Sequence, residues 1–105
     1  MGEVYRAVDL NLDRPVAIKL LPLWAAKDRM ARQRLLREAR SASALNHPNI
    51  VTIHSVEKAK GLDFIVMEYV EGETLHARIL RGPLELADLV DFGVQVAEAL
   101  ADAHA

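Results

Sequence analysis

The stretch Val16-Ala17-Ile18-Lys19 decides how this chain is interpreted, because it places one lysine in an otherwise apolar segment. The apolar run over residues 16–21 predicts a strand that is buried on both faces. Alternation along a strand puts the side chains of Ala17 and Lys19 on the same face. A small residue beside a lysine leaves room for a flat ligand with a phosphate beyond it. The strand therefore indicates a site that handles phosphate groups.

A helix predicted over residues 27–45 carries one carboxylate among apolar neighbours. Helical spacing places five residues on one face, namely Ala31, Leu35, Glu38, Ala42 and Leu45. A lone carboxylate is costly to bury, so Glu38 needs a cationic partner, and Lys19 is the obvious candidate. From periodicity alone, a solvated lysine and a surface glutamate remain the alternative.

The remaining patterns predict an α+β fold. Strands are expected at residues 3–9, 16–21, 50–56 and 62–69, and helices at 27–45, 74–81 and 85–104. The first two strands are expected to form a hairpin, and strands segregated from helices argue against a doubly wound sheet. The chain is therefore predicted to divide near Gly72 into a sheet part, residues 1–70, and a helical part, residues 71–105.

The composition excludes several classes of function. A formal net charge of -2 over 105 residues argues against a nucleic-acid partner, although arginines crowd residues 29–40. The absence of cysteine excludes disulfides, thiolate metal sites and cysteine nucleophiles. No apolar run approaches the ~20 residues of a membrane span, and no leader pattern is present, so a cytoplasmic chain is expected.

Five short segments carry a likeness to a known family. They are Met1–Tyr5, Val16–Lys19, Arg37–Ala39, His47–Val51 and Ile65–Gly72. In this order and spacing they resemble the smaller lobe of a eukaryotic-like serine/threonine protein kinase of the bacterial type. The resemblance covers essentially the whole chain. It implies an antiparallel sheet lacking its first strand, one ion-pair helix, and then two helices of the larger lobe.

The resemblance implies that ATP is the ligand, that Mg²⁺ accompanies it, and that a protein with serine or threonine hydroxyls is the substrate. Lys19 would bind the α- and β-phosphates, and Glu38 would hold Lys19 in place. Met67 would lie at the back of the adenine pocket as gatekeeper. The other implied ATP-binding residues are Gly2, Val4, Ala17, Glu68, Val70 and Thr74.

These further residues would contact different parts of ATP. The glycine would end the phosphate loop, and Val4 and Ala17 would cover the base. Glu68 and Val70 would present backbone groups to the adenine edge, a task that suits fixed backbone donors and acceptors. Thr74 would lie on the ribose side.

The segment Asp91-Phe92-Gly93 spells the magnesium motif of kinases, but it falls inside the helix predicted at residues 85–104. Helical spacing puts Asp91 on one face with Gln95, Glu98 and Asp102, which indicates a solvated face. We therefore predict no metal ligand in this chain.

The family's catalytic loop, H-R-D-x-x-x-x-N, does not occur within these 105 residues, so the catalytic aspartate is expected beyond Ala105. We therefore expect a fragment of a longer kinase that transfers no phosphate on its own. The helix at residues 85–104 is then expected to expose Leu86, Leu89, Val90 and Leu100.

Two alternatives stay open. One is a nucleotide-binding pseudokinase or scaffold module without phosphotransfer. The other is an unrelated helix-rich interaction domain that uses the arginines of residues 27–45 as its contact surface. In the kinase interpretation the same helix is available for regulatory contacts, and relatives of this kind often carry a membrane anchor elsewhere.

Overall fold

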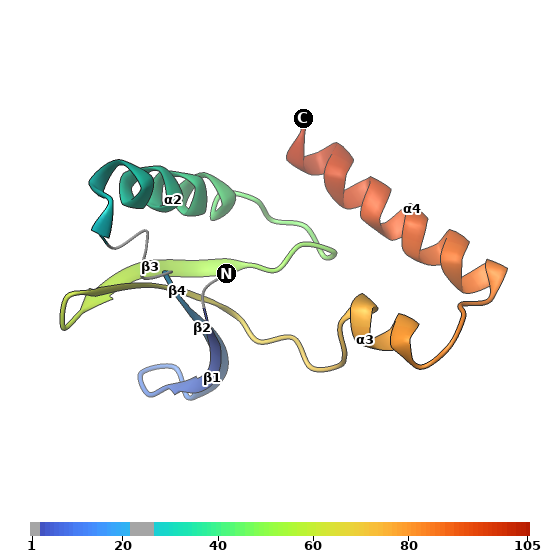
Figure 1. Ribbon diagram of the computed structural model, residues 1–105, viewed down its shortest axis with the longest axis horizontal. Coiled ribbons are helices and arrows are strands. Elements are labelled where there is room, and N and C mark those ends of the chain that lie inside the picture. Colours follow the sequence, from blue (N-terminus) through green and yellow to red (C-terminus); the bar gives the residue numbers. More distant parts are fainter. Residues whose placement is uncertain (1–2, 22–26) are drawn as a thin grey trace.

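The computed structural model describes residues 3–21 and 27–105. It consists of a sheet, one helix packed over the sheet, and two further helices to one side (Figure 1). The elements are β1 (Val4–Asp9), β2 (Arg14–Leu20), α2 (Arg29–Ala42), β3 (Ile53–Ala59), β4 (Leu62–Glu68), α3 (Leu75–Leu80) and α4 (Leu86–Ala103). The predicted α+β class and the predicted order of these elements are confirmed.

The sheet has the strand order β1-β2-β4-β3, and every neighbouring pair is antiparallel. The hairpin expected from the first two strands is confirmed. β2 lies inside the sheet, which accounts for its apolar sequence: Val16 is 2% exposed and Ala17 is 8% exposed. The strand with the lysine is therefore held by ladder hydrogen bonds on both sides.

The turn between β3 and β4 is tighter than the sequence pattern indicated. The predicted strands left residues 57–61 as the turn, whereas β3 continues to Ala59 and only Lys60 and Gly61 turn the chain. Both residues have positive φ, 51° and 76°, and a two-residue turn of this kind matches the twist of the strands it joins. The third strand begins at Ile53 rather than at residue 50.

Helix α2 begins at Arg29, two residues later than predicted, because the Asp28 side chain caps it. Asp28 Oδ1 accepts hydrogen bonds from the backbone N–H groups of Met30 (3.0 Å) and Ala31 (3.2 Å). These are two of the donors that a helix leaves unsatisfied at its start. The helix ends at Ala42, three residues earlier than predicted.

The face of α2 that packs on the sheet differs from the predicted one. Leu36 and Ala39 are buried, and the helix contacts β3. Glu38, which the spacing placed in the middle of the apolar face, is exposed. The predicted buried face was wrong. Apolar residues cover more than one side of this helix, so their spacing alone does not select the side that packs on the sheet.

Helix α4 packs little against the rest of the described chain. Ala99 is its buried residue. Its exposed large apolar side chains are Leu86, Leu89, Val90, Val94, Val96 and Leu100. The exposure expected for four of them is confirmed. None of the helices in the described ranges has the length and apolar character that crossing a bilayer requires.

Candidate nucleotide-binding site

The register of the sheet brings four of the predicted ATP-binding residues onto one face. Val4 of β1 pairs with Lys19 of β2, and Ala17 of β2 pairs with Met67 of β4. Directly paired residues of antiparallel strands point to the same side, and residues two apart on a strand share that side. Three adjacent strands therefore present Val4, Ala17, Lys19 and Met67 together. Gly2 lies outside the described residues.

This face can hold a flat ring beside an anionic group. Ala17 is buried and small, while Met67 and Lys19 are half-buried at positions on either side of it. The lysine ammonium is a compact charge on a flexible stem with three donors, which suits a phosphate oxygen. The arrangement therefore offers an apolar surface with one cation beyond it.

Lys19 and Glu38 are not paired in this structure. The ion pairs within 4.0 Å in the described part of the chain are Arg32–Asp63 and Arg81–Glu73. Glu38 lies exposed on α2, and Lys19 lies half-buried on β2. The structure therefore does not form the pair predicted for these two residues.

The last residue of β4 and the residue that follows it are both anchored. The Glu68 N–H donates to the Thr52 carbonyl (2.8 Å), and the Thr52 N–H donates to Glu68 Oε1 (3.1 Å). The Arg6 guanidinium lies 5.0 Å from the centre of the Tyr69 ring, a cation–π contact that ties β1 to this segment. The backbone hydrogen bonds of the described loops do not include Val70, whose N–H and carbonyl are therefore available to a ligand.

Thr74 has a structural task in addition to the ribose contact predicted for it. It is the N-cap of α3, and its Oγ1 accepts a hydrogen bond from the Ala77 N–H (3.0 Å). A cap of this kind typically contributes about 1 kcal/mol to helix stability. A ribose hydroxyl would have to share the oxygen that already serves the helix.

Sequence reasoning missed the ion pair between Arg32 on α2 and Asp63 on β4. Arg32 Nε donates to Asp63 Oδ2, and Arg32 Nη2 donates to Asp63 Oδ1 at 3.0 Å, so the contact is bidentate. Asp63 is 9% exposed, and its pairing with Arg32 holds the pKa of its carboxyl below the ordinary value despite burial. The sequence feature that could have indicated this ion pair is the single carboxylate, Asp63, in the otherwise apolar stretch Leu62–Met67.

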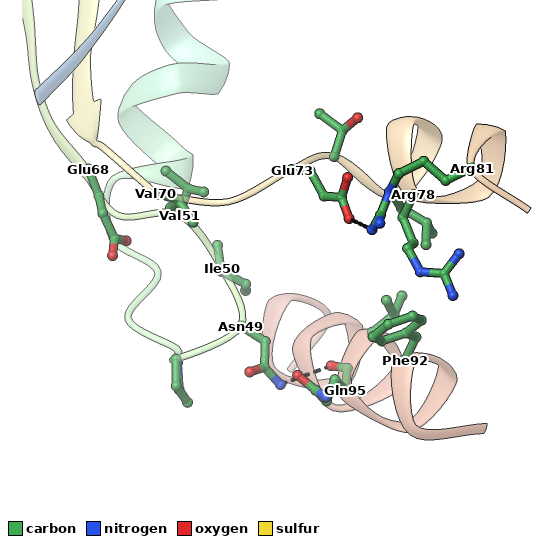
Figure 2. Close-up of a pocket in the computed structure, with 14 residues that line it drawn as sticks. Asn49, Ile50, Val51, Glu68, Val70, Glu73, Arg78, Arg81, Phe92 and Gln95 are labelled. Atoms are coloured by element: carbon green, nitrogen blue, oxygen red, sulfur yellow. Dashed lines mark hydrogen bonds and ion pairs between the residues drawn. The ribbon is translucent and has the colours of Figure 1, made fainter. Parts of the chain in front are cut away.

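A cavity of about 720 Å³ lies beside the segment after β4, between the connector that precedes β3 and helices α3 and α4 (Figure 2). Its lining includes Ile50, Val70, Leu75, Arg78, Arg81 and Phe92. Figure 2 shows Glu73 directed at Arg81, with which it forms an ion pair. The four residues gathered on the sheet face do not line this cavity, but three other predicted ATP-binding residues do, namely Glu68, Val70 and Thr74, so the cavity adjoins the candidate nucleotide site.

Asp91 lies within α4, where the sequence pattern placed it, and it is exposed. It accepts a hydrogen bond from Gln95 Nε2 (3.0 Å) one helical turn further on. Within residues 3–21 and 27–105, no three or more His, Cys, Asp or Glu side chains are grouped so that they could hold a metal ion.

Comparison with known families and proteins identifies what this chain is similar to. The protein kinase domain family matches residues 1–105. Serine/threonine-protein kinase PrkC of Bacillus subtilis is 46% identical over 105 residues, which cover 99% of this chain and 16% of PrkC. Serine/threonine-protein kinase pkn3 of Myxococcus xanthus is 42% identical over 106 residues, which cover 99% of this chain and 19% of that protein. The chain thus spans less than a fifth of the length of these curated relatives.

A solved structure shows the same arrangement of elements. The crystal structure of the PknI kinase domain of Mycobacterium tuberculosis superposes with a TM-score of 0.87 at 31% sequence identity. The superposition covers 99% of this chain and 43% of the PknI chain.

Proposed function

The chain belongs to the protein kinase family, and from that premise we propose that it forms the ATP-binding part of a serine/threonine kinase. In the proposed reaction, the γ-phosphate of ATP, accompanied by Mg²⁺, passes to a serine or threonine hydroxyl of a protein substrate. The observation that carries the proposal is the sheet register, which gathers Val4, Ala17, Lys19 and Met67 on one face.

The roles proposed for these residues are those that the resemblance to protein kinases implies, and their shared face of the sheet supports them. Val4 and Ala17 cover the adenine ring, and Met67 lies behind it. By the same resemblance Lys19 contacts the α- and β-phosphates, and its position one alternation step beyond Ala17 on the same strand is compatible with that role. The free backbone groups of Val70 support the proposal that the adenine edge is bound after β4.

We propose that the chain divides into a part that carries the phosphate-binding residues and a helical part. Residues 1–70 hold the sheet and α2, which carry the phosphate-side residues, and residues 71–105 hold α3 and α4. The family's catalytic loop motif is not among the 105 residues, so we expect this chain by itself to bind ATP without transferring phosphate.

Nucleotide binding by the full chain tests the proposal. We expect a fluorescent ATP analogue, displaced by ATP, to bind the chain, and Lys19→Met to weaken that binding at least tenfold. Lys27→Met, which removes an exposed lysine just before α2, is the matched control and should leave the affinity unchanged. Equal weakening by both variants, or no binding by the unaltered chain, contradicts the proposal. If the unaltered chain transfers labelled phosphate to a protein substrate and Lys19→Met does not, the expectation that the chain alone is inactive is wrong, but the proposed ATP binding is not contradicted.

The same experiment also tests a second candidate function, which is suggested by the absence of a Lys19–Glu38 ion pair among the described residues. A nucleotide-binding pseudokinase, or a scaffold module, would keep the ATP face without needing that pair for phosphotransfer. Nucleotide binding that depends on Lys19 but not on Glu38 favours this alternative. Loss of affinity in Glu38→Gln as well as in Lys19→Met favours the kinase.

A further inference from the structure

Helix α2 is basic and helix α4 is acidic, although the chain as a whole has a formal net charge of only -2. Within Arg29–Ala42, five arginines are accompanied by one glutamate. Within Leu86–Ala103, there are four carboxylates and no basic residue. Charges of opposite sign are therefore concentrated on two helices that are far apart in the sequence.

Three arginines lie along one exposed side of α2, and we call them the arginine face. At 3.6 residues per turn, Arg29, Arg37 and Arg40 fall within about 80° of one another around the helix. All three are exposed, and none of them forms an ion pair within 4.0 Å in the described part of the chain. Arg32 is different, because it is already paired with Asp63. The arginine face is therefore available to a partner.

A cavity of about 580 Å³ adjoins the arginine face. Its lining comprises Gln33, Leu36, Arg37, Arg40 and Ser41, and no carboxylate is among these residues. A guanidinium group can donate two parallel hydrogen bonds to one carboxylate, which fixes the geometry of the contact as well as adding to its strength. The composition of this lining therefore favours an acidic side chain as the occupant.

Helix α4 carries a matching row of carboxylates, which we call the carboxylate face. Asp91, Glu98 and Asp102 fall within about 40° of one another around the helix. All three are exposed, and none of them forms an ion pair within the ranges that the structure describes. The exposed apolar side chains Leu89 and Val96 lie roughly 150° away around the helix, so the carboxylate face is distinct from the apolar one.

The two faces also match in spacing. In each face the first and last residues are eleven positions apart in the sequence, which corresponds to about 16 Å along a helix. The middle residues, Arg37 and Glu98, lie about 12 Å and about 10 Å from the first residue of their faces. Two such helices placed side by side in the same direction therefore bring each arginine opposite a carboxylate.

We propose that the arginine face of α2 is a docking surface for the carboxylate face of α4 in a second copy of this chain. The contact is head-to-tail, because it joins two different surfaces, and each added copy leaves one face of each kind open. Exposed ion pairs are individually weak, so the contact is weak and depends on all three pairs together. Neither face contains a residue assigned to ATP binding, so this inference and the proposed function stand or fall separately.

Sedimentation velocity of the full chain at two salt concentrations measures the contact. Raising the salt from about 0.1 M to about 1 M shortens the Debye length from about 10 Å to about 3 Å, and we expect the association constant to fall about tenfold. Contacts between the apolar side chains of α4 carry no charge and are not weakened by this screening. The part of the association that salt removes is therefore the part to be tested with variants.

Charge reversal identifies the first face. The variant with a reversed arginine face carries Arg29→Glu, Arg37→Glu and Arg40→Glu. The matched control reverses three exposed cations outside that face, namely Arg14→Glu, Lys27→Glu and Arg34→Glu. At the lower salt concentration, we expect the first variant to lower the association constant about tenfold, as the loss of three exposed ion pairs predicts. The control has the same net charge and should change the association constant by no more than about twofold.

An exchanged chain identifies the second face. It adds Asp91→Lys, Glu98→Lys and Asp102→Lys to the reversed arginine face. Its formal net charge equals that of the unaltered chain, since three substitutions lower the charge and three raise it by the same amount. We expect it to recover the association constant, because each pair is restored with opposite signs. Circular dichroism checks that each variant is folded, and where one is not, Arg37→Glu alone and then with Glu98→Lys repeats the test.

Four results overturn the proposal. The first is association that salt does not weaken. The second is an equal loss of association in the reversed arginine face and in its matched control, which would be an effect of net charge alone. The third is a folded exchanged chain that does not recover the association. The fourth is an unaltered chain that stays monomeric at the lower salt concentration but binds polyglutamate through the arginine face, which would assign this face to an acidic segment of another protein.

Discussion

At the scale of single residues, one carboxylate in an apolar strand, that of Asp63, joins the sheet to helix α2. Asp63 is buried, yet its charge is satisfied by both nitrogens that the Arg32 guanidinium presents to it. Removing one partner leaves the other without compensation, which costs more than the pair itself contributes. The contact therefore affects stability through the penalty for breaking it.

We expect Asp63→Asn to lower the free energy of unfolding by about 1–3 kcal/mol, since the amide leaves the Arg32 guanidinium without its ionic partner. Equilibrium unfolding in urea, followed by circular dichroism, measures the change. Arg34→Met removes an exposed arginine from the same helix and should stay within about 0.5 kcal/mol of the unaltered chain. Equal effects of the two substitutions would show that the buried pair contributes nothing specific.

The same carboxylate makes stability depend on pH. The hydrogen bond from Arg32 is the main cause that lowers the pKa of Asp63, burial opposes it, and the charges of Arg32 and Lys58 lower it further. A group whose pKa is lower in the folded state stabilises the fold above its unfolded value, 3.8, and this stabilisation is lost as the pH falls below that value. We therefore expect the free energy of unfolding to fall as the pH is lowered below about 4, with a shallower fall in Asp63→Asn. Urea titrations at pH 3 to 6 measure both slopes, and identical slopes contradict the assignment.

The residue patterns explain which parts of the site could be predicted from the sequence. Val16 to Lys19 were assigned correctly to an interior strand because a continuous apolar run with one charge has few other interpretations. The predicted apolar face of residues 27–45 did not include Arg32, yet an arginine can lie along apolar surface and reach a buried carboxylate. Its partner Asp63 is 31 residues away in the chain, and no local pattern joins two such positions.

At the scale of the elements, helix and strand ends were less predictable than their order. The helix caps and the turn between β3 and β4 depend on the backbone conformations of single residues, which the spacing of apolar residues does not predict. Gly61 shows this most clearly, because its φ of +76° is a conformation that residues with a Cβ atom adopt at a cost.

Two glycine substitutions should therefore have opposite effects. Gly61→Ala forces a side chain into the positive-φ turn and should destabilise the chain by about 1 kcal/mol. Gly93→Ala lies inside α4, where an added Cβ meets no atom within 4 Å, and should stabilise the chain by about 0.5–1 kcal/mol. Thermal unfolding of the two variants is the measurement, and a shift of the same sign in both contradicts the turn geometry.

At the scale of the whole molecule, the sheet with α2 and the helix α4 differ in how much surface they bury. The antiparallel sheet and the order of its strands along the chain were predicted from the sequence, but the pairing of β2 with β4 was not, because no local pattern joins two distant strands. The surroundings of α4 were not, because the described chain offers its apolar side chains little to pack against. An exposed apolar helix face tends to associate with other apolar surface.

We expect the chain to self-associate with rising concentration, and we expect Leu89→Lys combined with Val96→Lys to suppress that association. The two side chains are about half exposed and lie two helical turns apart on α4, so the substitutions should not reduce the stability of the sheet. Sedimentation velocity at several concentrations measures the effect. Leu10→Lys, at a 90% exposed position in the β1–β2 turn, is the control, and suppression by it alone would place the association elsewhere.

The strand order has a consequence for synthesis on the ribosome. β2 pairs with β1 as soon as the first hairpin has emerged, but its other neighbour is β4, which follows α2 and β3 in the chain. Until β4 is made, the strand that carries Lys19 keeps one unpaired edge, and such an edge can pair with another nascent chain. The short β3–β4 hairpin, closed by its two-residue turn, can form quickly once translated and then dock as a unit beside β2. The face that carries Val4, Ala17, Lys19 and Met67 is therefore completed only when β4 joins the hairpin of β1 and β2.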